Sequence, residues 1–214
     1  MKIRKMEIVN LAAIIVAFAV AAYLYPLLPA RIASHWDING QVNGYMGRFW
    51  GTFFVPFMAL GLFIIFLVVP RIDPKSQNIE KFRKSFDLFV LLLLVFLFYI
   101  YALTILWAFN YHFNMTQLMI PAFSLLFFAM AALVKNAEPN WSIGIRTPWT
   151  LSSDVVWRKT HAVGGKLFTV AAGLTLLGLF FPALALWFAI APIIVCSLIV
   201  VVYSYFEFTK LPRT

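Results

Sequence analysis

The chain has 214 residues, of which 63% are hydrophobic and only 12% are charged. Soluble domains carry about a quarter charged residues, so a chain this poor in charge cannot cover an apolar core with a polar surface. The composition therefore excludes a soluble globular protein and predicts an all-α membrane protein.

Six apolar stretches are each long enough to cross a hydrocarbon layer about 30 Å thick, which needs about 20 helical residues. The first follows a basic tail and resembles a signal-peptide core, but its apolar run continues to Leu28, which favours a retained span. We predict transmembrane helices over residues 8–28, 49–69, 86–109, 116–134, 166–181 and 184–208.

Positive charge falls in alternate gaps between these spans. Of the 17 Lys and Arg residues, all but Arg31 and Arg48 lie in the two terminal tails, the second gap or the fourth gap. Cytoplasmic loops are enriched in Lys and Arg, so this pattern predicts that both termini are cytoplasmic. The formal net charge of +9 then reflects membrane orientation and attraction to anionic lipid, not nucleic-acid binding.

The loop between spans one and two, residues 28–48, is predicted to form a small extracellular hairpin. Asn39-Gly40 is typical of a type I′ turn, in which both central residues adopt positive φ. This hairpin is either a recognition element or a polar cap on the helix bundle. If it binds something, the side chains that we expect to take part are His35, Trp36 and Asp37.

Three potential metal ligands are predicted on the outside. His35 and Asp37 are two residues apart and would point the same way from a strand. Nothing in the sequence brings His112 to them, so we predict neither a metal site nor a cofactor. A membrane metalloenzyme stays an alternative, because imidazole and carboxylate groups are common zinc ligands.

The inside segment before span five, residues 135–166, contains a helix-start pattern. Ser152 or Ser153 can cap a helix, because a serine hydroxyl accepts a bond from a free backbone N–H of the first turn. Apolar and aromatic residues at helical spacing predict an interfacial cytoplasmic helix that lies along the bilayer. That helix would bend at Gly164-Gly165 to enter span five, and its apolar face would carry Trp157, His161 and Phe168.

The same segment contains a serine, an aspartate and a histidine, the residue types of a hydrolase triad. A triad needs its histidine within hydrogen-bond reach of both partners. His161 lies about two helical turns from Ser153, too far for contact. We therefore predict no catalytic residues and no enzyme. Arg146 suits a carboxylate or a lipid phosphate, because its guanidinium is planar and always charged.

The inside segment resembles the signature of the SdpI family of membrane proteins. The run N-x-x-x-G-x-R-T-P-W-T-L begins at Asn140, and it is followed by Trp157, Thr160-His161 and Gly164-Gly165. The earlier run L-P-x-x-I-x-x-H-W-x-x-x-G, from Leu28 to Gly40, is similar to the domain of unknown function that commonly precedes this family's domain. The resemblance covers essentially the whole chain.

The resemblance implies a two-span N-terminal domain over residues 1–85 and a four-span domain over residues 86–214, in a bacterial plasma membrane. It also implies immunity against a secreted sporulation-delaying peptide toxin, with a cytoplasmic repressor protein as a second partner. We expect toxin to act on the outer hairpin and the 146–161 segment to signal inward. A transporter or exporter is the main alternative. The cytoplasmic motif residues are Asn140, Gly144, Arg146, Thr147, Pro148, Trp149, Trp157 and His161.

Overall fold

The structure is a computed structural model that describes residues 4–212, so Lys2 and Arg213 of the charge count lie outside the described residues. Its elements in chain order are α1 (Lys5–Leu24), β1 (Arg31–Trp36), β2 (Val42–Gly47), α2 (Arg48–Ile72), α3 (Ser76–Lys81), α4 (Arg83–Ala108), α5 (Met115–Asn136), α6 (Pro148–Ser152), α7 (Asp154–Thr175) and α8 (Ala185–Thr209). Short 3-10 turns, Tyr25–Leu27, Leu176–Leu179 and Pro182–Leu184, extend or connect these helices.

The prediction of six helices able to span a membrane is confirmed by length and composition for the part of the chain that is described. The fifth of them begins at Asp154, twelve residues before its predicted start. With their 3-10 extensions they run Lys5–Leu27, Arg48–Ile72, Arg83–Ala108, Met115–Asn136, Asp154–Leu179 and Pro182–Thr209. The chain is a multi-pass membrane protein.

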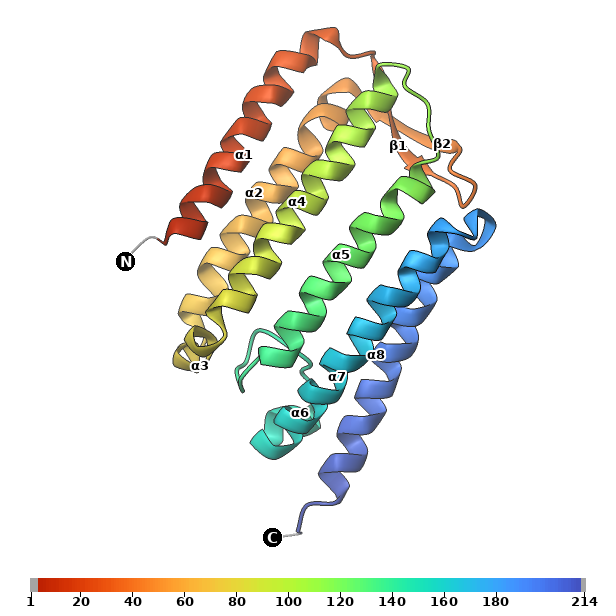
Figure 1. Cartoon of the computed structure of the whole chain (residues 1–214). Coiled ribbons are helices and arrows are strands. Elements are labelled where there is room, and N and C mark those ends of the chain that lie inside the picture. Colours follow the sequence, from red (N-terminus) through yellow and green to blue (C-terminus); the bar gives the residue numbers. More distant parts are fainter. Residues whose placement is uncertain (1–3, 213–214) are drawn as a thin grey trace.

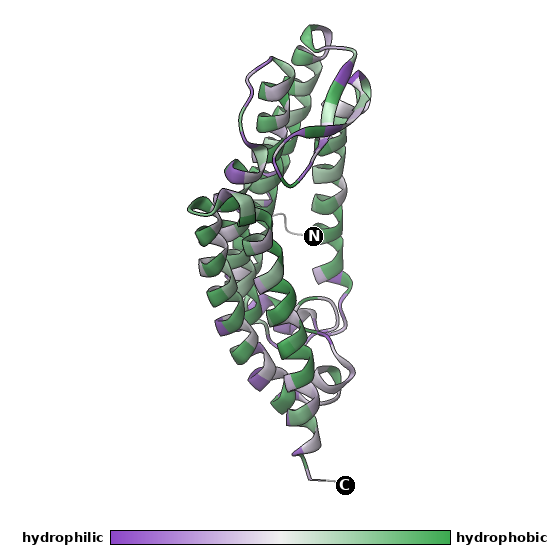
Figure 2. Cartoon of the chain, turned by 90° about the vertical axis from the view of Figure 1, so that its right-hand side faces the viewer, coloured by the Kyte–Doolittle hydropathy of each residue, from purple (hydrophilic) through white to green (hydrophobic). Residues whose placement is uncertain are grey.

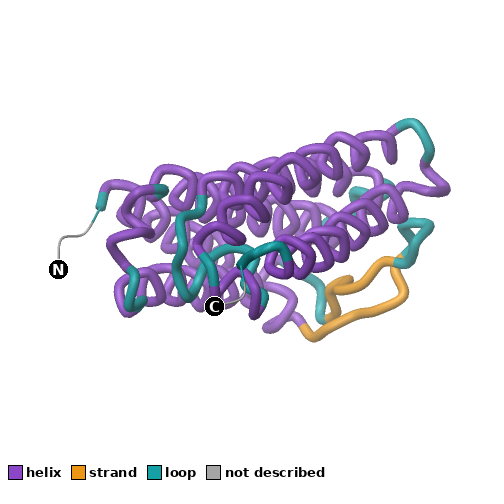
Figure 3. The backbone as a smooth tube through the Cα atoms, turned by 90° about the horizontal axis from the view of Figure 1, so that it is seen from below, coloured by secondary structure: helices purple, strands orange, loops and turns teal. Residues whose placement is uncertain are grey.

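The long helices run side by side as an elongated bundle (Figure 1). Helices α1, α2 and α4 pack together, α5 packs on α7, and α7 on α8, while α4 and α5 join the two groups. The tube view from below shows the two strands at one end of the helices, and loops at both ends (Figure 3). We call these the hairpin end, with β1 and β2, and the motif end, with α3 and α6.

The hydrophilic residues also concentrate toward the two ends, and the helix middles are apolar (Figure 2). Many large apolar side chains in these middles are exposed, among them Ile15, Ile65, Leu198 and Val202. A helix bundle in water would bury such residues, whereas lipid tails solvate them.

Small residues allow the closest helix contacts. A Cβ added at Gly165 of α7 would lie 2.6 Å from Lys135 Cβ, and one at Gly164 would lie 2.5 Å from Ile145 Cδ1. In α1, the buried face includes Ala17 and Ala21. Such close contacts increase van der Waals packing between helices. This packing matters in a membrane, because the hydrophobic effect does not drive helices together in lipid.

The predicted bend at Gly164-Gly165 is wrong, because α7 is one helix from Asp154 to Thr175. Gly165 allows the close approach of α7 to α5, and Gly164 allows the close approach of Ile145 from the loop between them. Trp157 and His161 are each 1% exposed and face the protein interior. The short helix before span five is α6. A division into two domains near residue 85 stays a prediction, since α4 packs on both groups of helices.

Candidate functional site

The connection between α5 and α7, residues 137–153, is a compact loop built around the Asn140 side chain. The Asn140 Nδ2 donates to the carbonyl of Ile143, and its Oδ1 accepts from the N–H groups of Ser142 and Ile143, at 2.8, 2.8 and 2.6 Å. An asparagine amide has both donors and acceptors, so one buried side chain satisfies several loop groups. The Asn140 side chain therefore stabilises the conformation of this loop.

The α2–α3 connection holds the same loop from the other side. The buried carboxylate of Asp73 accepts from Trp141 N–H at 3.0 Å and from the Ser142 hydroxyl at 2.5 Å. Asn78 Nδ2 donates to the Pro139 carbonyl at 2.7 Å. Sequence reasoning missed both residues, because they are more than 60 positions from the loop residues that they bind and no local pattern marks them.

His161 closes the loop against α7. Its Nε2 accepts from the Ile145 N–H at 2.9 Å, and its Nδ1 lies 2.9 Å from the Trp157 carbonyl. An accepting Nε2 carries no proton, so the ring is neutral and its Nδ1–H donates to that carbonyl. The ring also stacks on Trp157, with centroids 4.0 Å apart. Trp157 in turn donates its indole N–H to the Ala137 carbonyl at 2.7 Å.

Gly144 lies close to Nε2 of the His161 ring. Its φ is +118°, and an added Cβ would lie 2.5 Å from His161 Nε2. Both the backbone conformation and the space therefore require glycine. The structure thus brings Asn140, Gly144, Trp157 and His161 together as one buried unit.

Thr147 caps the short helix α6 that follows. Its hydroxyl accepts from Thr150 N–H at 3.1 Å, and Thr150 Oγ1 accepts from Thr147 N–H at 2.9 Å, which is a reciprocal capping box. Pro148 is the first residue of α6, where its missing N–H costs no bond. The Thr147 hydroxyl also lies 3.0 Å from that of Ser204, which ties the loop to α8.

The exposed part of the loop is separate from this buried unit. Arg146 is exposed and donates to the Trp141 carbonyl at 2.9 Å, and the Trp141 ring is exposed as well. Trp149 packs edge-on against Tyr205 of α8, with centroids 5.2 Å apart. Together with residues at the end of α8 it lines a groove of about 780 Å³ that contains Ser152, Ser153 and Phe208. These side chains are available to a partner.

Ser153 is the cap of α7, as the sequence predicts, and its hydroxyl accepts from Val156 N–H. The serine, aspartate and histidine do not form a triad, because both ring nitrogens of His161 bind backbone groups. Asp154 instead lies 3.9 Å from Lys75, in an exposed ion pair.

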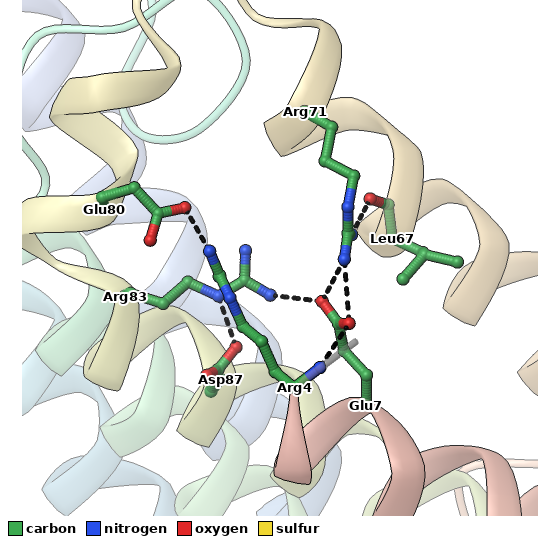
Figure 4. Close-up of polar contacts among 7 residues, drawn as sticks. All are labelled: Arg4, Glu7, Leu67, Arg71, Glu80, Arg83 and Asp87. Carbon is green, nitrogen blue, oxygen red and sulfur yellow. Dashed lines mark hydrogen bonds and ion pairs between the residues drawn. The ribbon is translucent and has the colours of Figure 1, made fainter. Parts of the chain in front are cut away.

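A buried carboxylate that sequence reasoning missed lies at the motif end of α1 (Figure 4). Glu7 accepts from Arg71 of α2 at 2.7 and 2.8 Å, and from Arg83 of α4 at 3.1 Å. Arg83 also pairs with Asp87 at 2.7 Å, and Arg4 with Glu80 at 2.6 Å. This network, the Glu7 cluster, joins α1, α2, α3 and α4 at one end.

A second buried glutamate, in the other group of helices, is also paired with two cationic side chains, which here are exposed lysines. Glu207 of α8 accepts from Lys159 of α7 at 2.7 Å and from Lys210 at 2.5 Å. A buried carboxylate is stable only when cations and donors surround it, and both glutamates meet that condition. Both lie at the motif end.

At the hairpin end, β1 and β2 pair antiparallel as predicted, with Ile32 opposite Met46 and Trp36 opposite Val42. The predicted type I′ turn is wrong, because Gly40 has positive φ (+77°) but Asn39 does not. The Asp37 carboxylate accepts from Asn39 and Gln41 N–H, each at 2.9 Å, and builds a longer turn. Aspartate favours such turns because its side chain bonds backbone two residues on.

The three outer metal-ligand candidates are engaged separately. His35 Nδ1 bonds to Asn43 Oδ1, the Asp37 carboxylate belongs to the turn, and the His112 ring packs on Trp107. Within residues 4–212 no three His, Cys, Asp or Glu side chains are placed to hold a metal ion.

A cavity of about 250 Å³ lies between the hairpin and the helices. Strand β1 contributes Ser34, His35 and Trp36, α4 contributes Ile100, and α8 contributes Leu186 and Ala189. The rest of its wall comes from α5, through Met115, Thr116, Met119, Ile120 and Phe123. Trp36, one of the predicted binding residues, is thus part of a pocket.

Comparison with known proteins finds a family match for each of the two signature segments. Residues 12–60 match the domain of unknown function DUF1648, and residues 136–205 match the SdpI/YfhL protein family. The chain is 24% identical over 167 residues to the immunity protein SdpI of Bacillus subtilis (strain 168), which covers 78% of this chain and 77% of that protein. No solved structure matches the chain significantly. The buried unit around His161 falls in the segment that matches the SdpI/YfhL family, and the hairpin falls in the segment that matches DUF1648.

Proposed function

We propose that this chain is an immunity protein that protects the membrane around it from a secreted peptide toxin. The observation that carries the proposal is the apolar cavity at the hairpin end, in a chain similar to the immunity protein SdpI over most of its length. A hydrophobic peptide that attacks a membrane from outside would meet this end first.

The proposal requires that the hairpin end faces outward. The charge distribution supports this orientation, because among residues 4–212 the hairpin end carries only Arg31 and Arg48 as Lys or Arg residues, while basic side chains gather at the motif end. Translocation of Lys and Arg is disfavoured, so the poorer end is the outer one.

Cysteine labelling tests the orientation. In a Cys196→Ala background, which removes the single native thiol, Asn39→Cys at the hairpin tip and Ser153→Cys at the motif end provide matched probes. In intact cells an impermeant maleimide is expected to label the first and not the second. Labelling of Ser153→Cys alone would show that the protein has the inverted orientation, and this result would contradict the proposal.

Survival tests the protection itself. We expect that expression in sensitive bacteria restores growth in the presence of a sporulation-delaying peptide toxin. The Arg146→Ala and Trp149→Ala variants show whether the exposed loop side chains contribute. Unchanged killing, with the protein detected in the membrane, would rule out the immunity function.

We also propose that the exposed loop surface contacts a cytoplasmic regulator and reports toxin binding. Arg146, Trp141 and the groove beside Trp149 supply charge, aromatic surface and shape for such a contact. The test is the labelling rate of Ser153→Cys in inside-out vesicles with and without toxin, beside Lys210→Cys as a probe on the neighbouring tail. A change confined to Ser153→Cys is expected, and equal rates with and without toxin would refute the signalling role.

A further inference from the structure

Three exposed lysines from three successive long helices lie at one level of the bundle, near the motif end. Lys84 is in the first turn of α4, Lys135 is in the last turn of α5, and Lys166 belongs to α7. The residues that follow the first two, Ser85 and Asn136, are joined by a hydrogen bond of 3.1 Å between their side chains. Lys135 also packs on the glycine that precedes Lys166, since a Cβ added there would lie 2.6 Å from Lys135 Cβ. We call these three lysines the lysine row.

The lysine row has no counter-charge within residues 4–212. The ion pairs of that part of the chain all involve other cations. Asp87, three residues after Lys84, pairs with Arg83 at 2.7 Å. Glu138, three residues after Lys135, lies within 4 Å of no described cation. Neighbouring positive charges repel one another, and an anion between them removes that repulsion. The lysine row therefore suits a negatively charged ligand.

An apolar groove of about 240 Å³ lies between α4 and α5, on the faces that carry two of these lysines. Lys84 and Val95 are about three helical turns apart and so share a face of α4. Lys135 and Pro121 are about four turns apart and share a face of α5. Val95 and Pro121 both line the groove, so the two faces meet there. The one polar side chain of the described lining, Tyr99, donates its hydroxyl to a backbone carbonyl at 2.9 Å.

The surface between the lysines and the groove is apolar and open to lipid. Leu88 of α4 is 46% exposed and Phe128 of α5 is 40% exposed. The groove begins at Leu92, eight residues after Lys84, which is about 12 Å along the helix axis. One leaflet of the hydrocarbon core is about 15 Å deep. The acyl chain of a lipid whose head group lies at the lysine row therefore reaches the groove.

We propose that Lys84 and Lys135 bind the head group of one anionic phospholipid, and that an acyl chain of this lipid lies in the groove between α4 and α5. Lys166 adds positive potential beside the head group. The lysines require an anion and the groove requires a hydrocarbon, and a phospholipid carries both in one molecule. A free phosphate would leave the groove empty, and an uncharged peptide would leave the lysines without an anion. The site does not depend on the immunity function.

Native mass spectrometry of the full chain in detergent tests the site, because it gives the dissociation constant of each bound lipid. The probes are phosphatidylglycerol and phosphatidylcholine with the same two palmitoyl chains, so that only the head group differs. We expect phosphatidylglycerol to bind more tightly. A lysine near an anionic lipid contributes about fivefold in affinity, so Lys84→Gln and Lys135→Gln together should weaken binding about thirtyfold. Equal dissociation constants for the two lipids would overturn the proposal.

Two double variants control for net charge and for folding. Lys5→Gln with Lys75→Gln removes the same charge at positions outside α4, α5 and α7, and it should bind phosphatidylglycerol as wild type does. Lys84→Arg with Lys135→Arg keeps both charges and should also bind it. If Lys5→Gln with Lys75→Gln loses as much affinity as Lys84→Gln with Lys135→Gln, net charge alone attracts the lipid and the proposal is wrong.

Variants that fill the groove test the place of the acyl chain. Ala122→Phe fills it from α5 and Leu92→Trp from α4, and the matched variant Ala22→Phe adds a ring at an exposed position of α1. Both filling variants are expected to weaken phosphatidylglycerol binding, and Ala22→Phe to leave it unchanged. Wild-type affinity in either filling variant would show that the chain lies elsewhere and would overturn the proposal.

Two other occupants give different results in the same measurement. Displacement of phosphatidylglycerol by excess inorganic phosphate would show that the lysine row binds a free anion. A wild-type dimer that Ala122→Phe abolishes would show that a second copy of the chain covers the groove. Either result would overturn the proposal, whereas a monomer that keeps its lipid in phosphate supports it.

Discussion

His161 Nε2 accepts a hydrogen bond from the backbone N–H of Ile145 at 2.9 Å. A side chain of α7 therefore holds the middle of a loop that lies 16 residues earlier in the chain. The bond places the signature histidine in the scaffold of the loop, whereas Arg146 in the same loop is exposed.

Replacing His161 by phenylalanine is expected to lower the free energy of unfolding by about 1–3 kcal/mol, the usual cost of a buried N–H left without its acceptor. The phenyl ring keeps the stacking position on Trp157. Thermal unfolding in detergent measures the effect, with His112→Phe at an exposed position as the control. Equal stability of both variants would show that the Ile145 bond contributes nothing.

The Gly144→Ala variant is expected to lose about 2 kcal/mol or more, because alanine at a φ of +118° is strained and its Cβ would meet His161. Gly173→Ala is the matched change in α7, where an added Cβ meets nothing within 4 Å. That variant should gain about 0.5–1 kcal/mol, since glycine weakens a helix interior. The same denaturation assay ranks the pair, and the reverse order would contradict the structure.

Removing the charge of Glu7 is expected to be costly, because Arg71 and Arg83 would lose their shared buried carboxylate. Glu7→Gln should destabilise the protein by about 3–5 kcal/mol, the range for breaking a buried ion pair from one side. Glu80→Gln removes the same charge from an exposed pair with Arg4 and should cost less than about 1 kcal/mol. Denaturant titration of both variants measures the difference between their free energies of unfolding. Equal values for the two variants would show that Glu7 is solvated and would contradict its buried position.

Docking of the hairpin on α2 depends on Gly51. An added Cβ there would lie 2.6 Å from Ile32 Cβ, so Gly51→Ala must displace strand β1, at a cost of about 1–3 kcal/mol. Amide hydrogen exchange in β1 and β2 is expected to accelerate. Gly47→Ala, where an added Cβ meets nothing within 4 Å, should leave exchange unchanged. Slow hairpin exchange in Gly51→Ala would contradict this contact.

The sequence predicts the spans and the hairpin well, because long apolar runs and short turn segments are local patterns. It misplaces the start of span five by twelve residues. The first turns of α7 contain Arg158 and Lys159, which are exposed, so average hydropathy hides a helix whose other face buries Trp157. Local spacing does not reveal which face of a helix is covered by a distant loop.

The site is only partly predictable for the same reason. Asn140, Gly144 and Trp157 stand in a recognisable signature, yet the sequence does not show that they are buried in one unit. Asp73 and Glu7 carry no signature at all, and their partners come from other helices. The turn at Asp37 differs from the predicted type because a side-chain carboxylate, not the Asn-Gly pair, organises its backbone.

Both buried glutamates, Glu7 and Glu207, lie at the same end of the molecule, and within residues 4–212 the ion pairs that join different helices all lie at that end. A helix of 25 residues is about 38 Å long, so a tilt of about 3° at the fixed end moves the free end by about 2 Å. A small tilt of the helices about the ion pairs at the motif end would therefore change the distance between them at the hairpin end by more than an atom's radius. The ion pairs themselves would stay intact.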